Sequence, residues 1–136
     1  MNMATTRQLI TEFDRVTYAG TIKLFHSLIE LAKSNSRILH VVTVKRDSQF
    51  IKVLKDYGTF KKYLDNRAAS SSSLIRWDTI TTLRSIEVNS LVLCPFLDSS
   101  QLFSVEEHLS ENNMLIVLEL VSGYCEEWKK KYNIQK

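Results

Sequence analysis

Three apolar runs along the chain alternate with stretches in which apolar residues recur at helical spacing. The runs cover residues 38–44, 90–96 and 114–120, and together they contain a single charged side chain, Glu119. A strand that is apolar on both faces is typical of a parallel sheet with helices packed against each face. The runs therefore predict internal parallel strands. We expect Pro95 at the end of its strand, because proline has no N–H to donate within a sheet.

The stretches between these runs predict helices. The first should follow a turn at Gly20 and end at Ser34 to Ser36, because its apolar residues recur every three or four positions. That stripe consists of Ile22, Phe25, Leu28, Ile29 and Ala32. The second helix is predicted between Asp47 and Tyr57, and Gly58 has the position of a C-terminal glycine.

Two further helices are predicted in the second half of the chain. Asp98 is expected to cap one of them, with Leu102, Phe103, Val105 and Leu109 on its apolar side. Residues after Gly123 predict a charged helical tail that contains Trp128. A short helical piece is also indicated by Phe60, Tyr63 and Leu64.

The pattern leaves two segments open. Residues 8–13 fit either a first strand or the start of a helix, because their apolar spacing suits both. Residues 74–86 carry several threonines, which favour a strand, at a spacing that fits a helix. Residues 68–73, with four consecutive serines, predict a flexible surface loop.

The alternation of helices and strands predicts an α/β fold. Right-handed crossovers would build a mainly parallel sheet within a three-layer α/β/α sandwich, Rossmann-like or RecA-like. A chain of 136 residues suits one domain, which we expect to span residues 1–136. The outer strands would be the first segment and residues 74–83, and the edges of these strands are natural docking sites for a partner.

Composition narrows the class of protein only slightly. The net charge of +3 does not by itself indicate nucleic-acid or membrane binding. We expect no membrane partner, because the N-terminus lacks a signal-peptide pattern and no apolar run reaches membrane-spanning length. Cys94 and Cys125 stand apart without metal-ligand spacing, which suggests reduced thiols in a cytoplasmic or nuclear protein.

Catalytic chemistry is not indicated by any motif. Gly20 and Lys23 lie where a phosphate-binding loop would begin its helix, but their spacing does not match GxxxxGK[ST]. Cys94 is expected to be a core thiol, and Asp98 a helix cap in preference to a metal ligand. We therefore predict no catalytic residue, metal or cofactor.

The remaining titratable side chains have ordinary interpretations. His26, His40 and His108 lack metal spacing and are expected to be structural. The acidic pairs Glu106-Glu107 and Glu126-Glu127 are expected on solvated helix faces.

A basic segment between residues 45 and 67 is the best candidate binding surface. Its basic residues outnumber its acidic ones, and Tyr57, Phe60 and Tyr63 are interleaved with them. Such a surface can neutralise phosphates and stack bases, so we predict nucleic-acid contact by tRNA or DNA. The predicted contacts are Lys45, Arg46, Lys52, Lys55, Lys61 and Lys62. A solvated helix face is the alternative interpretation.

Two tryptophans are candidate anchors of a protein interface. Trp77 and Trp128 qualify because tryptophan is enriched among the residues that dominate binding energy. Burial of Trp77 in the core of this chain is the alternative.

Several segments of the chain resemble parts of a RecA-like domain whose phosphate loop has degenerated. These segments are 14–20, 37–42, 90–93, Asp98-Ser99-Ser100 and 114–117. Domains of this kind occur in the small RecA-like subunits of the Elongator complex, which supports tRNA wobble-uridine modification. They also occur in non-catalytic paralogues of eukaryotic recombinases. The resemblance implies an assembly role, and no catalytic residue carries over from it.

The sequence thus favours a non-catalytic interaction subunit of a multiprotein complex, either a hetero- or a homo-oligomer, with tRNA or DNA contact. A small enzyme with a pocket at the carboxyl ends of the parallel strands is one alternative. A DNA-recombination or repair accessory protein is another.

Overall fold

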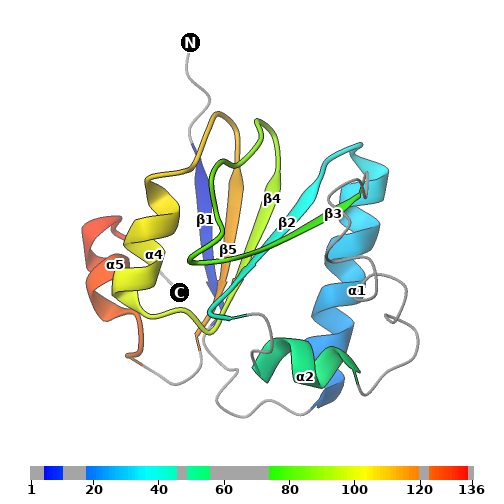
Figure 1. The fold of residues 1–136 in the computed structure, drawn as a ribbon, viewed down its shortest axis with the longest axis horizontal. Helices are drawn as coiled ribbons and strands as arrows, with labels where there is room; N and C mark the ends of the chain where they lie inside the picture. The colour runs from blue at the N-terminus through cyan, green and yellow to red at the C-terminus, as the bar shows by residue number, and fades with distance from the viewer. Residues whose placement is uncertain (1–4, 11–17, 46–48, 56–73, 120–122, 135–136) are drawn as a thin grey trace.

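A computed structural model describes residues 5–10, 18–45, 49–55, 74–119 and 123–134. Helices and strands alternate along most of these segments, as the sequence pattern predicts, but the strands at residues 75–79 and 91–95 follow each other without a helix between them (Figure 1). The elements are β1 (Thr6–Ile10), α1 (Tyr18–Ser34), β2 (Leu39–Thr43), α2 (Gln49–Lys55), β3 (Ile75–Thr79), β4 (Leu91–Pro95), α4 (Ser99–Glu106), β5 (Met114–Leu118) and α5 (Glu126–Lys131).

The five strands form one sheet in the order β1-β5-β4-β2-β3, and every neighbouring pair is parallel. The prediction of an α/β fold with a parallel sheet is confirmed. β1 and β3 are the outer strands. The first strand of the chain therefore lies at the far side of the sheet, paired residue by residue with the last strand from Thr6–Met114 to Ile10–Leu118.

The predicted internal strands are confirmed at β2, β4 and β5. Every residue of β2 and β4 is buried, because each strand has a neighbour on both sides and helices over both faces. Pro95 is the last residue of β4, as expected. Leu91 donates its N–H to Ile38 of the β2 side, so the alternation of the ladder points the nitrogen of Pro95 toward β2 as well. The β2–β4 register ends two residues earlier, at Val41–Leu93, so no sheet hydrogen bond is lost to proline.

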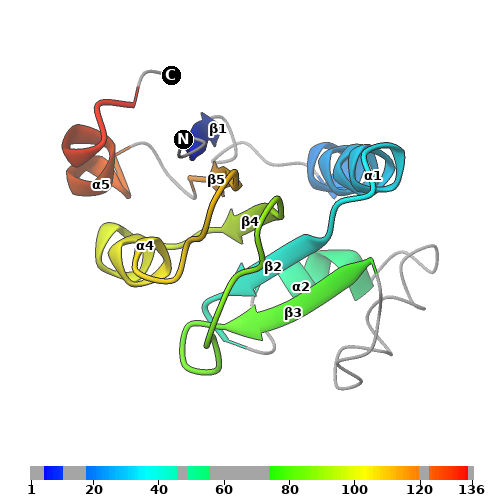
Figure 2. The ribbon, with the colours of Figure 1, turned by 90° about the horizontal axis from the view of Figure 1, so that it is seen from above.

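The sheet has helices on both faces. Seen from above, α1 and α2 lie on one side of the sheet, and α4 and α5 lie on the other (Figure 2). We call these the α1/α2 face and the α4/α5 face. Each face has its own cluster of buried apolar side chains.

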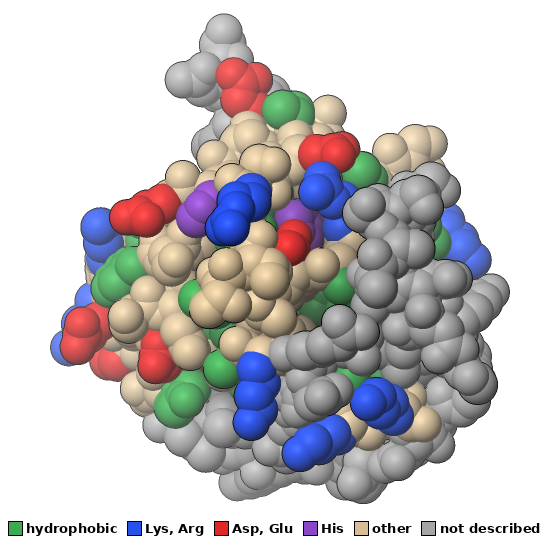
Figure 3. All heavy atoms as spheres, in the orientation of Figure 1, with side chains coloured by type: hydrophobic (Ala, Val, Ile, Leu, Met, Phe, Trp, Pro, Cys, Tyr) green, Lys and Arg blue, Asp and Glu red, His purple; other side chains and the backbone are tan. Residues whose placement is uncertain are grey.

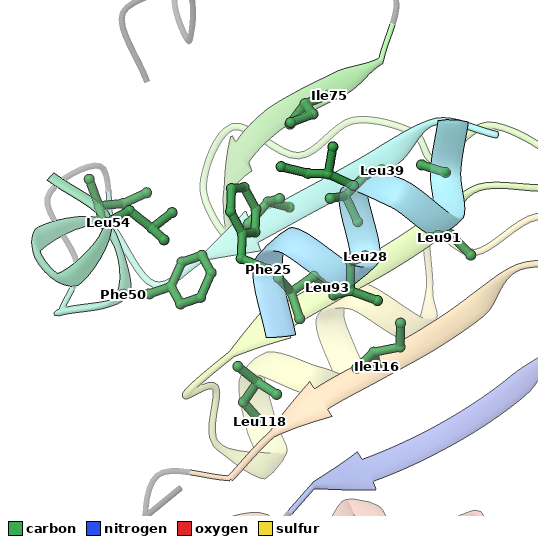
Figure 4. Close-up of a cluster of buried hydrophobic side chains, with 14 of the residues drawn as sticks. Phe25, Leu28, Leu39, Phe50, Leu54, Ile75, Leu91, Leu93, Ile116 and Leu118 are labelled. Carbon is green, nitrogen blue, oxygen red and sulfur yellow. The ribbon is translucent and has the colours of Figure 1, made fainter. Parts of the chain in front are cut away.

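The α1/α2 face is packed with aromatic rings. The predicted stripe of α1 is buried at Phe25, Leu28, Ile29 and Ala32. Figure 4 shows Phe25 of α1 and Phe50 of α2 gathered with aliphatic side chains of the sheet. The rings of Phe25 and Phe50 meet edge to face, with centroids 5.7 Å apart. Aromatic pairs of this geometry add to the stability gained from burial alone.

The structure resolves the two open segments. Residues 6–10 form a strand, and so the helical alternative for the first segment is wrong there; residues 11–13 lie outside the described part. Only residues 75–79 of the segment 74–86 form a strand. A turn follows in which the Thr79 N–H donates to the hydroxyl of Thr82 at 2.8 Å. The threonines of this segment therefore stabilise the turn and do not extend the strand.

Other predictions are corrected or lie outside the described residues. Gly20 does not precede the first helix but lies in its first turn, because α1 begins at Tyr18. Trp128 is fully buried on the α4/α5 face, so it is a core residue and not an exposed interface anchor. The predicted features at Gly58, residues 60–64 and residues 68–73 lie outside the described part of the chain.

Candidate functional site

The strand order reverses between β2 and β4. From β2 the chain moves outward to β3 and then returns to β4 on the opposite side of β2. In open α/β sheets, ligands bind outside the carboxyl ends of the strands at such a reversal. The carboxyl ends of β2 and β4 are therefore where a ligand site is expected in this fold.

Aromatic side chains occupy the α1/α2 side of this reversal. Phe96 follows β4 with φ 66°, a conformation that bulky residues rarely adopt. Its ring packs against Phe50 of α2 with the centroids 6.4 Å apart, and only 8% of the residue is exposed. The place where this fold usually receives a ligand is thus lined here by apolar rings. The sequence contained a partial signal, since Pro95-Phe96 stands where a metal-binding carboxylate would be expected in a nucleotide-hydrolysing domain.

Three of the predicted basic residues come together next to this reversal. Lys45 follows β2, and Lys52 and Lys55 lie in the last turn of α2. All three are exposed, and α2 contains no acidic residue. Figure 3 shows Lys and Arg side chains gathered over α2, near the lower edge of the view. We call Lys45, Lys52 and Lys55 the α2 cationic surface; the other predicted contacts, Arg46, Lys61 and Lys62, lie outside the described residues.

An open cavity of about 310 Å³ lies at the N-terminal ends of α4 and α5. Its lining is hydroxylic and acidic: Asp98, Ser99, Ser100, Gly123, Tyr124, Glu126 and Glu127. Asp98 caps α4, as predicted. Its carboxylate accepts the N–H of Gln101 at 2.8 Å, and the side chain of Gln101 accepts the N–H of Asp98 at 2.9 Å. This capping box occupies one oxygen of Asp98. Glu126 and Glu127 are exposed, as predicted.

The two cysteines are buried thiols. Burial raises the pKa of Cys94 far above its usual value. Burial raises the pKa of Cys125 to about 12, and the hydrogen bond between this thiol and Glu119 is the second cause. The thiolate is the nucleophilic form of cysteine, and it is therefore suppressed at both positions. This agrees with the prediction that Cys94 is a core thiol.

The histidines occupy three different environments. His40 is fully buried on β2, and its Nε2 lies 2.6 Å from a carboxylate oxygen of Asp78 on β3. Burial lowers the pKa of His40, and the hydrogen bond to Asp78 only partly opposes this effect. His26 is exposed on α1, and the Nδ1 of His108 lies 2.9 Å from the carbonyl of Ser104. Among the described residues, no group of three or more His, Cys, Asp or Glu side chains is arranged to hold a metal ion.

A partly buried ion pair lies on the α4/α5 face, and no pattern in the sequence indicates it. Arg7 of β1 donates two hydrogen bonds, of 2.8 and 2.7 Å, to the carboxylate of Glu106 at the end of α4. The indole N–H of Trp128 donates to the same carboxylate at 2.9 Å. The guanidinium of Arg7 also lies over the ring of Tyr132, 4.1 Å from its centroid. The hydrogen bonds to Glu106 raise the pKa of Arg7.

This ion pair corrects one prediction. Glu106 was expected on a solvated helix face, but only 6% of its side chain is exposed. Its neighbour Glu107 is exposed, as predicted. Arg7 and Glu106 are separated by 99 positions, so no local pattern links them. The contact arises because β1 pairs with β5 and thereby comes close to α4 and α5.

Trp77 occupies an intermediate position. It lies on the outer strand β3, it is partly exposed, and its ring lies 5.9 Å from that of Phe25. One part of the side chain thus completes the α1/α2 core. The exposed part leaves the predicted interface role of Trp77 as a prediction.

Comparison with known proteins adds no assignment. A scan against protein-family models finds no family that matches this chain, and a search of curated proteins finds no significant match. Within the described residues, every helix is too short or too polar to cross a lipid bilayer.

Proposed function

We propose that this chain is a non-catalytic interaction subunit of a multiprotein complex and that its α2 cationic surface contacts the phosphates of a nucleic acid. The observation that carries the proposal is the convergence of Lys45, Lys52 and Lys55, all exposed, on one short helix and the strand end beside it. The apolar rings of Phe50 and Phe96 at the strand-order reversal support a role without bound substrate.

The chemistry of the α2 cationic surface suits phosphate backbones in preference to bases. Lysine ammonium groups are flexible point charges, which neutralise phosphates without reading sequence. Binding through them releases counterions, so the logarithm of the affinity falls with the logarithm of salt concentration by about 0.7–0.9 per phosphate contacted. The proposal therefore predicts binding that is salt-dependent and nearly independent of sequence.

Fluorescence anisotropy with labelled tRNA and single-stranded DNA at several salt concentrations tests this contact. Replacing Lys45, Lys52 and Lys55 by alanine should weaken binding by roughly 10-fold or more at low salt and flatten the salt dependence. Lys23→Ala with Lys33→Ala removes two exposed lysines from α1 and is the matched control, which should bind almost as the wild type does. Equal losses in both variants, or binding that ignores salt, would contradict the proposed surface. A preference for single-stranded DNA would favour the recombination accessory role over tRNA contact.

Affinity purification of the native protein tests the assembly role. A stable complex with defined stoichiometry would support it, whereas a monomer that hydrolyses or transfers a group on a small molecule would refute it. The all-parallel sheet with helices on both faces supports the finer architecture that we propose, a three-layer sandwich of RecA-like type. The proposed setting is the cytoplasm or nucleus, where tRNA or DNA is available.

A small enzyme remains the second candidate function, because the cavity of about 310 Å³ lies beyond the carboxyl end of β4. Asp98, Tyr124 and Glu126 line this cavity and supply acidic and hydroxyl groups. Heat-stability screening against a panel of small polar metabolites tests this candidate. A ligand that raises the melting temperature of the wild type but not of Tyr124→Ala would favour it, and an unchanged melting temperature throughout would count against it.

A further inference from the structure

The outer strand β3 presents its second edge away from the sheet. Among the described strands, β3 pairs only with β2 and lies at one end of the sheet (Figure 2). Leu74 accepts a hydrogen bond from the β2 side, and the N–H of Ile80 donates one to that side. Successive residues of a strand direct their N–H and C=O groups to opposite sides, so those of Trp77 point away from β2. An edge of this kind can pair with another strand.

The two neighbours of Trp77 have opposite charges on one face of the sheet. Trp77 packs against the α1/α2 cluster, so Arg76 and Asp78 project toward the α4/α5 face. Arg76 donates to Glu87 at 2.9 Å, and Asp78 lies 2.6 Å from Nε2 of His40. A guanidinium has five donors and a carboxylate about four acceptor positions, so these contacts leave capacity for a further partner. Both side chains also remain accessible, with 31% of Arg76 and 19% of Asp78 exposed.

This charge order is complementary to its own reversed copy. When two β3 strands lie antiparallel about a two-fold axis at Trp77, Arg76 of each copy stands opposite Asp78 of the other. These are non-hydrogen-bonded positions, where opposite Cα atoms lie about 4.5 Å apart and side chains are closest. Opposite charges there favour pairing, and like charges oppose it. An axis at Arg76 or Asp78, or an in-register parallel copy, would bring like charges together. The charges therefore select one orientation and one register.

We propose that the edge of β3 is the interface of a homodimer, in which two copies pair antiparallel about Trp77. The N–H and C=O of each Trp77 bond those of the other, and the two indoles lie side by side on the α1/α2 face. Charged residues on an edge strand normally discourage pairing. Here they exclude strands of another charge order and admit the reversed copy. This inference goes beyond the proposed function, because the dimer requires neither nucleic acid nor another subunit.

The turn after β3 limits the length of the interface. The N–H of Thr79 donates to the hydroxyl of Thr82 at 2.8 Å, and its carbonyl accepts the N–H of Thr82 at 3.2 Å. Thr79 lies opposite Ile75 across the proposed axis, so main-chain pairing ends on both sides of Trp77. A contact of this length predicts a weak dimer whose population depends on protein concentration.

Analytical ultracentrifugation of the full chain over a wide concentration range tests the proposal. The mass should rise from monomer toward dimer and no further, because a two-fold interface is closed. Arg76→Glu should raise the dissociation constant about 10-fold or more, since acids then face each other at both symmetric positions. Glu87→Gln is the matched control, because it removes the partner of Arg76 within the chain. It should change the dissociation constant by less than about 3-fold.

Two further measurements make the test specific to this register. Asp78→Arg should also weaken self-association, whereas a mixture of the Arg76→Glu and Asp78→Arg chains should form a heterodimer, because each introduced charge meets its opposite. In the wild type, NMR of mixed isotope-labelled and unlabelled chains should show contact between the α-protons of Arg76 and Asp78 of different copies.

The proposal is overturned by a chain that stays monomeric at every concentration, by a dimer that Arg76→Glu does not weaken, or by the absence of the intermolecular α-proton contact. A monomer would leave the salt-dependence test of the α2 cationic surface unaffected, so the two proposals fail separately.

Discussion

The two faces of the sheet are held by different kinds of interaction. The α1/α2 face is joined by the rings of Phe25, Phe50, Phe96 and Trp77 within an aliphatic cluster. The α4/α5 face contains an equally apolar cluster, but the Arg7–Glu106 ion pair, His40 and both thiols lie within or beside it. The stability of the α1/α2 face should therefore be reduced mainly by substitutions that remove side-chain volume. The stability of the α4/α5 face should be reduced mainly by substitutions that remove a hydrogen-bond partner or change a charge.

The largest expected effect comes from Phe25→Ala on the α1/α2 face. Removing a fully buried ring that contacts Phe50 and Trp77 should lower the free energy of unfolding by about 3–5 kcal/mol, because it deletes apolar contacts and leaves a cavity. Denaturant unfolding measures the loss. Leu31→Ala on the same helix is the control, because Leu31 is 39% exposed, and it should cost less than about 1 kcal/mol. Similar losses in the two variants would mean that α1 is not docked through Phe25.

Glu106→Gln should produce the next largest effect, on the α4/α5 face. The change leaves the guanidinium of Arg7 without its anion while Trp128 can still donate to the amide, and a loss of about 2–3 kcal/mol is expected. Chemical denaturation at low and high salt provides the measurement.

Glu107→Gln is the matched control for this prediction, because Glu107 is adjacent and exposed, and a change within about 0.5 kcal/mol is expected. The double variant Arg7→Met with Glu106→Leu should recover part of the loss, since apolar replacements remove both charges of the pair together. If Glu107→Gln cost as much stability as Glu106→Gln, the Arg7–Glu106 ion pair would not be the cause.

A smaller effect is expected at the start of α4. Asp98→Ala removes the capping box and should cost about 1 kcal/mol, while Asp98→Asn, which retains a side-chain oxygen acceptor, should cost distinctly less. Thermal unfolding of both variants gives the comparison. Equal melting temperatures for the two would show that the cap contributes little.

The smallest expected effect is a pH dependence. The pKa of His40 in the folded chain lies below the ordinary value of 6.5, mainly because the ring is buried. The unfolded chain therefore takes up a proton more readily as pH falls below about 6.5, and the free energy of unfolding should fall through that range until the folded ring also titrates. Asp78, Arg76 and Glu87 are the charged groups that act on the ring.

Unfolding curves between about pH 5 and pH 7.5 measure this slope. His40→Gln should flatten it, and His26→Gln, which changes an exposed histidine, should leave it unaltered. A slope that survives His40→Gln would assign the effect to other groups. No comparable slope is expected from the described side chains of the α1/α2 cluster, because they are apolar.

The sequence predicted those parts of the fold that depend on local pattern. Continuous apolar runs identified β2, β4 and β5, because two-sided burial leaves little room for charge. The apolar stripe identified α1, although its start was placed too late because Gly20 was interpreted as a turn. The place of β1 beside β5 was not predicted, since strand order depends on contacts between distant segments.

The candidate site shows the same limit. Exposure of Lys45, Lys52 and Lys55 follows from their polar positions in the pattern, and all three are exposed in the structure. Their contact with nucleic acid stays a prediction. The buried state of Glu106 could not be predicted, because its partner Arg7 lies at the other end of the chain. The interface prediction for Trp128 rests only on the enrichment of tryptophan at interfaces, whereas the indole packs inward and donates to Glu106.

The pairing of β1 with β5 has a consequence for biosynthesis. β1 leaves the ribosome before the other strands, whereas its partner Glu106 follows 99 residues after Arg7, and Met114–Leu118 follow later still. At about 5–20 residues per second, the first strand waits several seconds before it can join the sheet. Closing so long a loop also slows folding in a complete chain. Docking of β1 should therefore be a late step, and shortening the chain before Met114 should leave β1 undocked while β2 and β4 can already pair.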